Sequence, residues 1–508
     1  MPCTPEHLIK RDGSIKDFDP SKIQKAIEKA GKATGEFGPA IAAEITENQV
    51  MPKIRALNVA TPHIEQVQDA VEQALFESGH FTTLRAYIVY REQRAKSRDA
   101  KKTWINVESS INEYLDQSDW RVNANANQGY SLGGMILNVS GKVVANYWLN
   151  FIYPNEIGKC HREADFHIHD LDMLSGYCAG WSLRTVLTEG FNGVPGKVEA
   201  GAPKHLSSAC GQIVNFLGTM QNEWAGAQAF SSFDTYMAPF VRKDNVPYSE
   251  VVQCIQEMIY NLNVPSRWGT QTPFTNLTFD WTCPPDLAPQ HPMIGGEEMP
   301  FTYGDLQEEM NMINRAYIEV MTRGDSKGRV FTFPIPTYNI TPDFDWEGPN
   351  VKLLFDMTAR YGLPYFQNFI NSELKPNMIR SMCCRLQLDL RELLKRGNGL
   401  FGSAEQTGSL GVVTINCARL GYLYPGDEKA LYARLDHLLD LAKESLEIKR
   451  KVIQRHIDQG LFPYTKRYLG TLRNHFSTIG VNGINEMIRN FTHCLLYTSP
   501  SPRDVEES

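Results

Sequence analysis

From residue 106 onward, helix-like segments alternate with short β-prone runs, and this alternation limits the fold more than any other feature of the chain. Alternation of this kind is typical of an α/β architecture, although periodicity alone does not predict closure into a barrel. Because 508 residues exceed what one hydrophobic core usually serves, we expect two domains or one large barrel with an appendage. The helical patterns cover residues 208–230, 248–261 and 306–322, and the β-prone runs cover residues 274–279, 330–333 and 410–415.

A separate, mainly helical module is predicted for residues 7 to about 95. Asp12-Gly13 lies between two short β-prone pieces, which is a hairpin signal. A first helix is predicted to begin at Asp19-Pro20-Ser21 and to end at Gly31. Further helices are predicted over residues 41–51, from residue 61 to residue 79, and from residue 82 into the charged run 91–102.

The overall composition excludes several classes of protein. A net charge of -7 and a pI near 6.0 give no sign of a nucleic-acid surface, so any phosphate binding must be local. The chain has no apolar run of about eighteen residues and no signal-peptide layout at its N-terminus, so we expect neither a membrane span nor secretion. Its ten cysteines form no C-x-x-C motif. We therefore expect free thiols and a cytoplasmic location.

Three short motifs stand out along the chain, and two of them contain cysteine. Two cysteines are adjacent in Met382-Cys383-Cys384-Arg385, and Cys178 follows the segment His167-Ile168-His169-Asp170. The third motif is the run Gly411-Val412-Val413-Thr414-Ile415-Asn416. Cys178 taken alone would be interpreted as a small buried hydrophobic residue. Adjacent thiols are uncommon in a reducing compartment, so the Cys383-Cys384 pair favours chemistry about as strongly as packing.

Together these motifs, in this order, resemble the catalytic core of the anaerobic (class III) ribonucleoside-triphosphate reductases, which are glycyl-radical enzymes. The resemblance covers about residues 7 to 492. It implies a ten-stranded α/β barrel, built from two half-barrels with a finger loop through the centre, and an N-terminal ATP-cone. The domains implied are an ATP-cone over residues 1–98, a partial barrel over residues 104–492 and a disordered, non-native tail over residues 493–508.

The resemblance implies reduction of ribonucleoside triphosphates to 2′-deoxyribonucleoside triphosphates by thiyl-radical chemistry. Cys384 would carry the thiyl radical on the finger loop, and Cys178 would be the thiol on the opposite face of the ribose. Met382 would contact an oxidised Cys178 through its soft thioether, and Asn416 would hydrogen-bond the sugar or formate.

Other residues are expected to bind the substrate or an effector. His167 and His169 could converge on a metal if both lie on one face of a strand, but no third ligand stands out nearby, and the family uses this segment to orient the active site. We therefore expect no metal site. Substrate binding is expected at Ser207, Ser208, Gln271, Thr272, His167 and His169, and allosteric ATP binding at Lys10, Arg11, Lys22 and Thr61. The competing interpretations are a plain Ser N-cap and a solvated basic turn.

The chain departs from the family pattern in two ways. The radical glycine, in an Arg-x-x-Gly-Tyr motif, and the four-Cys zinc site are expected beyond residue 492 and are not found here, so this chain alone is expected to be inactive. Cys383 is an additional thiol that would allow a thioredoxin-like reductant in place of formate. The resemblance further implies a radical-SAM activating enzyme, a homodimer, and ATP and dATP as effectors.

Two other functions remain in competition. One is another glycyl-radical enzyme, such as a formate- or diol-acting lyase, which would have no need of an ATP-cone. The other is a nucleotide-binding regulatory protein with a degenerate barrel, which Cys384, Cys178 and Asn416 argue against. The sequence that follows residue 492 in the gene would discriminate between them.

Overall fold

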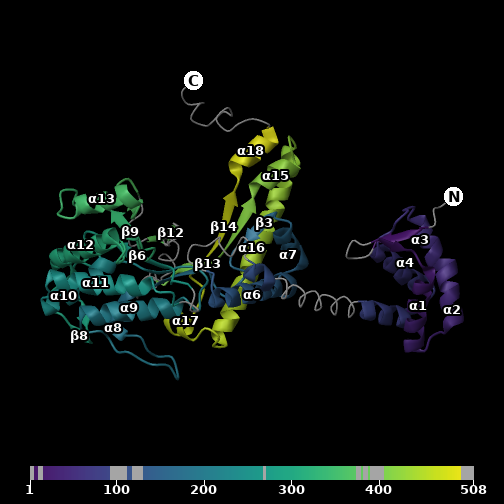
Figure 1. Cartoon of the computed structure of the whole chain (residues 1–508), viewed down its shortest axis with the longest axis horizontal. Helices are drawn as coiled ribbons and strands as arrows, with labels where there is room; N and C mark the ends of the chain where they lie inside the picture. The colour runs from purple at the N-terminus through teal and green to yellow at the C-terminus, as the bar shows by residue number, and fades with distance from the viewer. Residues whose placement is uncertain are drawn as a thin grey trace. The chain divides into compact units, whose positions relative to one another are not determined.

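The computed structural model describes residues 5–9, 15–91, 111–116, 130–266, 271–372, 379–381, 387–389 and 406–492. The chain divides into two compact units, Met1–Asn112 and Glu113–Ser508 (Figure 1). Each unit has a hydrophobic core of its own.

The N-terminal unit is a small hairpin followed by helices. Asp19 caps the first helix by accepting a hydrogen bond from the Ser21 N–H at 3.0 Å. The predicted end at Gly31 is wrong: the helix continues to Thr34, and Gly35 ends it with a φ of 73°. Gly31 instead leaves room for the Phe37 ring, because a Cβ there would lie 2.4 Å from that ring. The elements are β1 (His7–Ile9), β2 (Ile15–Asp17), α1 (Pro20–Thr34), α2 (Pro39–Ile45), η1 (Thr46–Val50), α3 (Met51–Ala56), α4 (Ile64–Glu77) and the helical residues 81–91.

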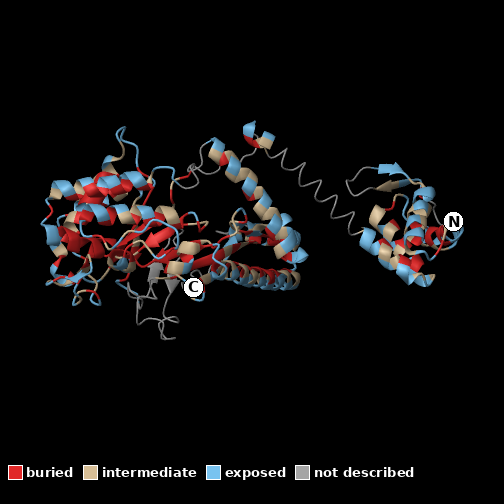
Figure 2. Ribbon diagram, turned by 90° about the horizontal axis from the view of Figure 1, so that it is seen from below, coloured by how far each residue is buried: buried red, intermediate tan, exposed pale blue. Residues whose placement is uncertain are grey.

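Five parallel strands form the first half of the sheet in the larger unit. Their order is β4-β5-β6-β9-β10, and each pairs in parallel with its neighbour. The strands are short, and all except the edge strand β10 are buried, which is usual for a parallel sheet covered by helices (Figure 2). Their bounds are β4 (Cys178–Trp181), β5 (Gln228–Phe230), β6 (Thr275–Phe279), β9 (Ile335–Ile340) and β10 (Tyr365–Asn368).

The second half of the sheet is built around β13 (Gly408–Asn416). This strand is antiparallel to β4 and to β3 (Phe166–Ile168), and parallel to β14 (Phe476–Asn482). The chain direction therefore reverses between β4 and β13, where the two halves of the sheet join. Two predictions for the first half of the sheet differ from the structure. The pattern at 208–230 contains both helix α9 and strand β5, and the strand expected at 330–333 lies at Ile335–Ile340.

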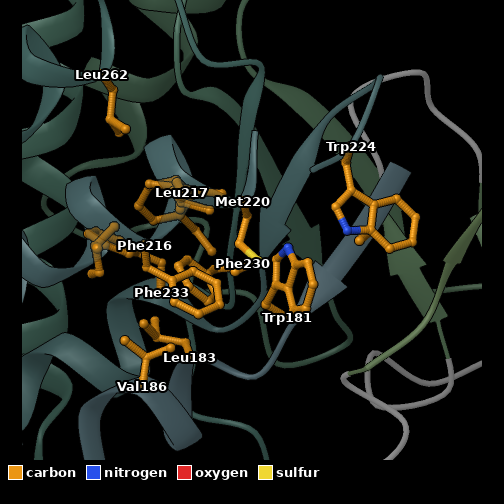
Figure 3. Packing of buried hydrophobic residues seen from close by; sticks show 14 of the residues in the cluster. Trp181, Leu183, Val186, Phe216, Leu217, Met220, Trp224, Phe230, Phe233 and Leu262 are labelled. Atoms are coloured by element: carbon orange, nitrogen blue, oxygen red, sulfur yellow. The ribbon is translucent and has the colours of Figure 1, made fainter. Parts of the chain in front are cut away.

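Helices cover the parallel strands from one side. α9, α10, α11 and α12 lie together next to β6 and β9 (Figure 1). Aromatic side chains of α9, α10 and α12 pack against aromatic side chains of the sheet. Phe216 of α9 packs against Trp181 of β4 and Phe230 of β5, with ring centroids 5.5 Å apart in both pairs (Figure 3). The first helices are α6 (Leu132–Tyr147), α7 (Asn155–Arg162), α8 (Leu183–Glu189), α9 (Leu206–Met220), α10 (Phe233–Asp244), α11 (Tyr248–Leu262) and α12 (Gln307–Arg323).

The remaining elements complete the larger unit. The long helix α16 lies against β13 and β14. β11 (Ile379–Ser381) and β12 (Gln387–Asp389) pair as antiparallel strands on either side of residues 382–386. The other elements are η3 (Trp148–Ile152), β7 (Met293–Ile294), β8 (Glu297–Glu298), η4 (Tyr303–Asp305), α13 (Val351–Tyr361), α15 (Cys417–Leu423), α16 (Glu428–Asp458), α17 (Pro463–Tyr468) and α18 (Ile484–Thr492).

Candidate functional site

Cys178 lies where the two halves of the sheet meet. It is the first residue of β4, it is fully buried, and it pairs with Ser409 across the antiparallel junction with β13. The Cys178 Sγ accepts a hydrogen bond from the Ala227 N–H at 3.2 Å. A backbone donor of this kind fixes the direction of the Cys178 side chain.

Two glycines leave space for Cys178. A Cβ at Gly226 would lie 2.6 Å from the Cys178 Sγ, and a Cβ at Gly408 would lie 2.1 Å from the Cys178 carbonyl oxygen. Real side chains do not approach so closely, so the strand junction around the thiol requires residues without side chains at both positions.

Ser409 is a site residue that the sequence analysis missed. Its side chain is buried directly opposite Cys178, and its hydroxyl lies 3.1 Å from the Thr478 Oγ1 on β14. The only sequence signal was its position after Gly408 at the start of a β-prone run. Only strand pairing between residues 231 positions apart places Ser409 opposite Cys178.

Asn416 is not brought to Cys178. It lies at the opposite end of β13 from Ser409, seven residues along the strand, which is roughly 20 Å at the usual rise. Its side chain caps α15 by accepting the Arg419 N–H at 3.1 Å and donates to the Ala164 carbonyl at 3.0 Å. The contacts of Asn416 are thus those of a helix cap, and the expectation that it contacts the reacting sugar beside Cys178 finds no support in this geometry.

The predicted histidines form a ring cluster beside β13. His167 lies on β3, and the His169 Nε2 is 3.0 Å from the Thr414 Oγ1. The ring centroids of His167 and His169 are 4.7 Å apart, and those of His161 and His167 are 5.3 Å apart. Burial lowers the pKa of His167, and burial followed by the charges of His167 and Arg162 lowers the pKa of His161 to about 4. His161 and His167 are therefore neutral at pH 7.

The two predicted substrate-binding turns lie at opposite edges of the parallel sheet. Ser207 and Ser208 begin α9, which runs back from the carboxyl end of β4 to the start of β5, so they lie away from the edge where Cys178 begins β4. Both serines are exposed, and the Ser208 hydroxyl donates to the His205 carbonyl at 2.8 Å as part of a capping box. Gln271 and Thr272 precede β6 and share the edge of Cys178.

Several predicted residues fall outside the described part of the chain. Met382, Cys383 and Cys384 lie in the connection between β11 and β12, and Lys10 and Arg11 lie between β1 and β2.

The other two predicted effector-binding residues lie in the N-terminal unit. Lys22 lies on α1 with a side chain that is 79% exposed. Thr61 lies next to the hairpin, because the Ile9 N–H donates to the Pro62 carbonyl at 3.0 Å and Ile9 bridges to His63. The hairpin and the Thr61 segment are therefore neighbours.

The described residues contain no cluster of three or more His, Cys, Asp or Glu side chains that could hold a metal ion. No helix in the same part of the chain has both the length and the apolar character needed to cross a membrane.

The chain matches the models of two known protein families. The model of the family described as anaerobic ribonucleoside-triphosphate reductase matches residues 124–506, and the ATP cone domain matches residues 6–96. Anaerobic ribonucleoside-triphosphate reductases from Salmonella typhimurium and Escherichia coli are 24% identical over 87% of this chain. The chain spans 62% of the length of each of these relatives.

Solved structures support the same fold. The anaerobic ribonucleotide reductase from Thermotoga maritima, in complex with dATP and CTP, aligns with a TM-score of 0.58 at 20% identity. The alignment covers 77% of this chain and 68% of that one. The predicted α/β fold with an N-terminal ATP-cone is therefore confirmed.

Proposed function

Because the chain belongs to the anaerobic ribonucleoside-triphosphate reductase family, we propose that it serves the reduction of ribonucleoside triphosphates to 2′-deoxyribonucleoside triphosphates. The observation that carries this proposal is Cys178. A fully buried thiol stands at the junction of the two half-sheets, next to two glycines that no side chain could replace without displacing it.

In the proposed reaction, two cysteines act on opposite faces of the ribose. A thiyl radical on Cys384 takes the 3′-hydrogen atom, and the 2′-hydroxyl then leaves as water with a proton supplied by Cys178. Cys384 lies outside the described residues, in the sequence between β11 and β12, which pair as antiparallel strands. The buried backbone hydrogen bond to the Cys178 Sγ holds that thiol in position.

The finer parts of the proposal concern cofactors and partners. The family stores its radical on a glycine that a radical-SAM enzyme activates, and we carry this over as part of the proposal. The electrons come from formate or, through Cys383, from a thioredoxin-like protein. ATP and dATP bind the N-terminal unit as effectors, where the hairpin and Thr61 are neighbours. The active form is a homodimer.

Nucleotide binding at the Cys178 junction is the first test. Hydrogen–deuterium exchange of the 508-residue chain should slow in peptides that contain β4 and the start of β13 when CTP is added at millimolar concentration. Tripolyphosphate is the control, because it offers the same phosphates without the sugar and base. Equal exchange with and without CTP in both peptides would contradict the proposal.

A further inference from the structure

The two faces of the parallel sheet differ in chemistry. Along β6, Leu277 and Phe279 face the helices and belong to the main core, whereas Asn276 and Thr278 alternate with them and face the other side. Strand register extends this second face, because Thr278 pairs with Thr337 of β9, and Asn339 of β9 pairs with Gln367 of β10. Its members on these three strands are Asn276, Thr278, Thr337, Asn339 and Gln367. We call these five residues the inner polar face.

The inner polar face is buried but its hydrogen bonding is incomplete. Asn276, Thr278, Asn339 and Gln367 are exposed by only 0%, 5%, 4% and 6%. Within the described part of the chain, no partner is found for the Asn276 Oδ1, the Thr278 Oγ1, the Asn339 Oδ1 and the Gln367 Nε2. Buried polar atoms nearly always have partners, and these four gather on one face of three neighbouring strands, so a ligand on that face could supply all four partners.

The inner polar face lies on the same side of the sheet as Cys178. Cys178 and Gly180 alternate with Ala179 and Trp181, which belong to the helix-side core. Gly180 pairs with Ala229 of β5, and Ala229 pairs with Asn276, so one face runs from Cys178 to β6. Two strand spacings separate β4 from β6, which is roughly 10 Å. A nucleotide whose sugar lies at Cys178 can therefore reach the inner polar face.

The hydrogen-bonding character of the four atoms without partners in the described residues indicates which part of a nucleotide they can bind. Two of them are amide oxygens that accept hydrogen bonds, one is an amide N–H donor, and one is a hydroxyl that does both. The Asn339 Nδ2 donates to the buried Asp280 carboxyl at 3.1 Å, which adds oxygen rather than positive charge. Carbonyl and carboxyl oxygens repel phosphate, whereas mixed donors and acceptors match the edge of a base.

We propose that the inner polar face of β6, β9 and β10 binds the nucleobase of the substrate, while the sugar lies at Cys178. This inference rests on the proposed function and assigns residues to base recognition. The Asn276 and Asn339 amides are fixed, because their Nδ2 groups donate to the Ile335 carbonyl and the Asp280 carboxyl, so their Oδ1 atoms stay acceptors. The Thr278 hydroxyl can both donate and accept, so it can adapt to more than one base.

Isosteric variants test the proposal in the 508-residue chain. Thr278→Val removes only a hydroxyl for which the described residues supply no partner, so folding should be unaffected. Binding of CTP, measured by titration calorimetry, should weaken roughly two- to tenfold for the loss of one hydrogen bond. The double variant Thr278→Val/Gln367→Met should weaken it further. Ribose 5-triphosphate, which lacks the base, should bind each variant as it binds the unmodified chain.

Thr275→Val is the matched control. Thr275 lies on the same strand, is fully buried and also has a hydroxyl without a partner in the described residues. Its side chain, however, points to the helix-side face with Leu277, opposite to the face of Thr278. This variant should bind CTP normally. Unchanged CTP binding in the double variant, or equal weakening of CTP and ribose 5-triphosphate, would overturn the base assignment and leave the proposed function standing. Absence of CTP binding in the unmodified chain would overturn both.

Discussion

At the scale of single residues, the space around Cys178 is the most sensitive feature. Gly226→Ala would place a methyl group 2.6 Å from the Cys178 Sγ and 2.9 Å from the Tyr177 carbonyl oxygen. We expect the free energy of unfolding of the larger unit to fall by about 1–3 kcal/mol, the usual effect of overpacking. Urea denaturation followed by tryptophan fluorescence would measure the change. Gly211→Ala on α9 is the control, because a Cβ there meets nothing within 4 Å and should not destabilise the helix.

A buried carboxyl pair gives a second residue-scale prediction. Asp234 accepts N–H groups from Asp280, Trp281 and Asn314 at 2.8–2.9 Å, so we assign the negative charge to Asp234. Burial, followed by the charge of Asp234, raises the pKa of Asp280 to about 7. The folded state therefore keeps a proton that the unfolded chain loses near pH 3.9.

The proton held by Asp280 in the folded state makes stability depend on pH. Between about pH 4 and pH 7 the folded state binds more protons than the unfolded state, so the free energy of unfolding falls as pH rises through this window. Asp280→Asn should flatten that fall in a series of thermal melts, whereas Asp343→Asn, at an exposed aspartate, should leave the slope unchanged. A slope that is identical in Asp280→Asn and the unmodified chain would contradict the assignment of the proton.

At the scale of elements, one buried carboxylate joins three segments around β13. Asp165, which is 5% exposed and directly precedes β3, pairs with Arg419 of α15 at 2.8 Å and Arg434 of α16 at 2.7 Å. Asp165→Asn would leave two guanidinium groups without their carboxylate. We expect a loss of about 2–3 kcal/mol in urea denaturation, below the value for fully buried pairs because the arginines are partly exposed.

Glu163→Gln is the control for that element-scale prediction. Glu163 lies two residues away, is about half exposed and pairs only loosely with Lys159 at 3.8 Å. Its replacement should change stability by less than about 0.5 kcal/mol. Equal effects of the two substitutions would show that the Asp165 cluster does not hold these elements together.

At the scale of the whole molecule, the two units should unfold in separate calorimetric transitions, because each has its own hydrophobic core. ATP at 100 times its Kd should stabilise only the N-terminal unit, by about 2.7 kcal/mol. Lys22→Ala should reduce this shift, whereas Lys29→Ala, at another exposed lysine of α1, should not. An ATP-induced shift of the larger transition alone would contradict effector binding at the N-terminal unit.

The sequence by itself determined the local features of this protein. Helix starts at Asp19-Pro20 and after Thr61-Pro62 follow from capping residues and proline, and the α/β alternation follows from hydrophobic spacing. Cys178 could be singled out from its motif, although its role is a proposal. These signals depend on a few neighbouring residues, so they can be interpreted without a fold.

Only the tertiary structure decided which distant residues share a site. Strand register places Ser409 opposite Cys178, keeps Asn416 at the far end of β13, and puts Thr278 and Thr275 on opposite faces of β6. A shift of one residue in any of these pairings would exchange the two faces of a strand. Register is set by packing between segments that lie far apart in the chain, and no local pattern in the sequence records that packing.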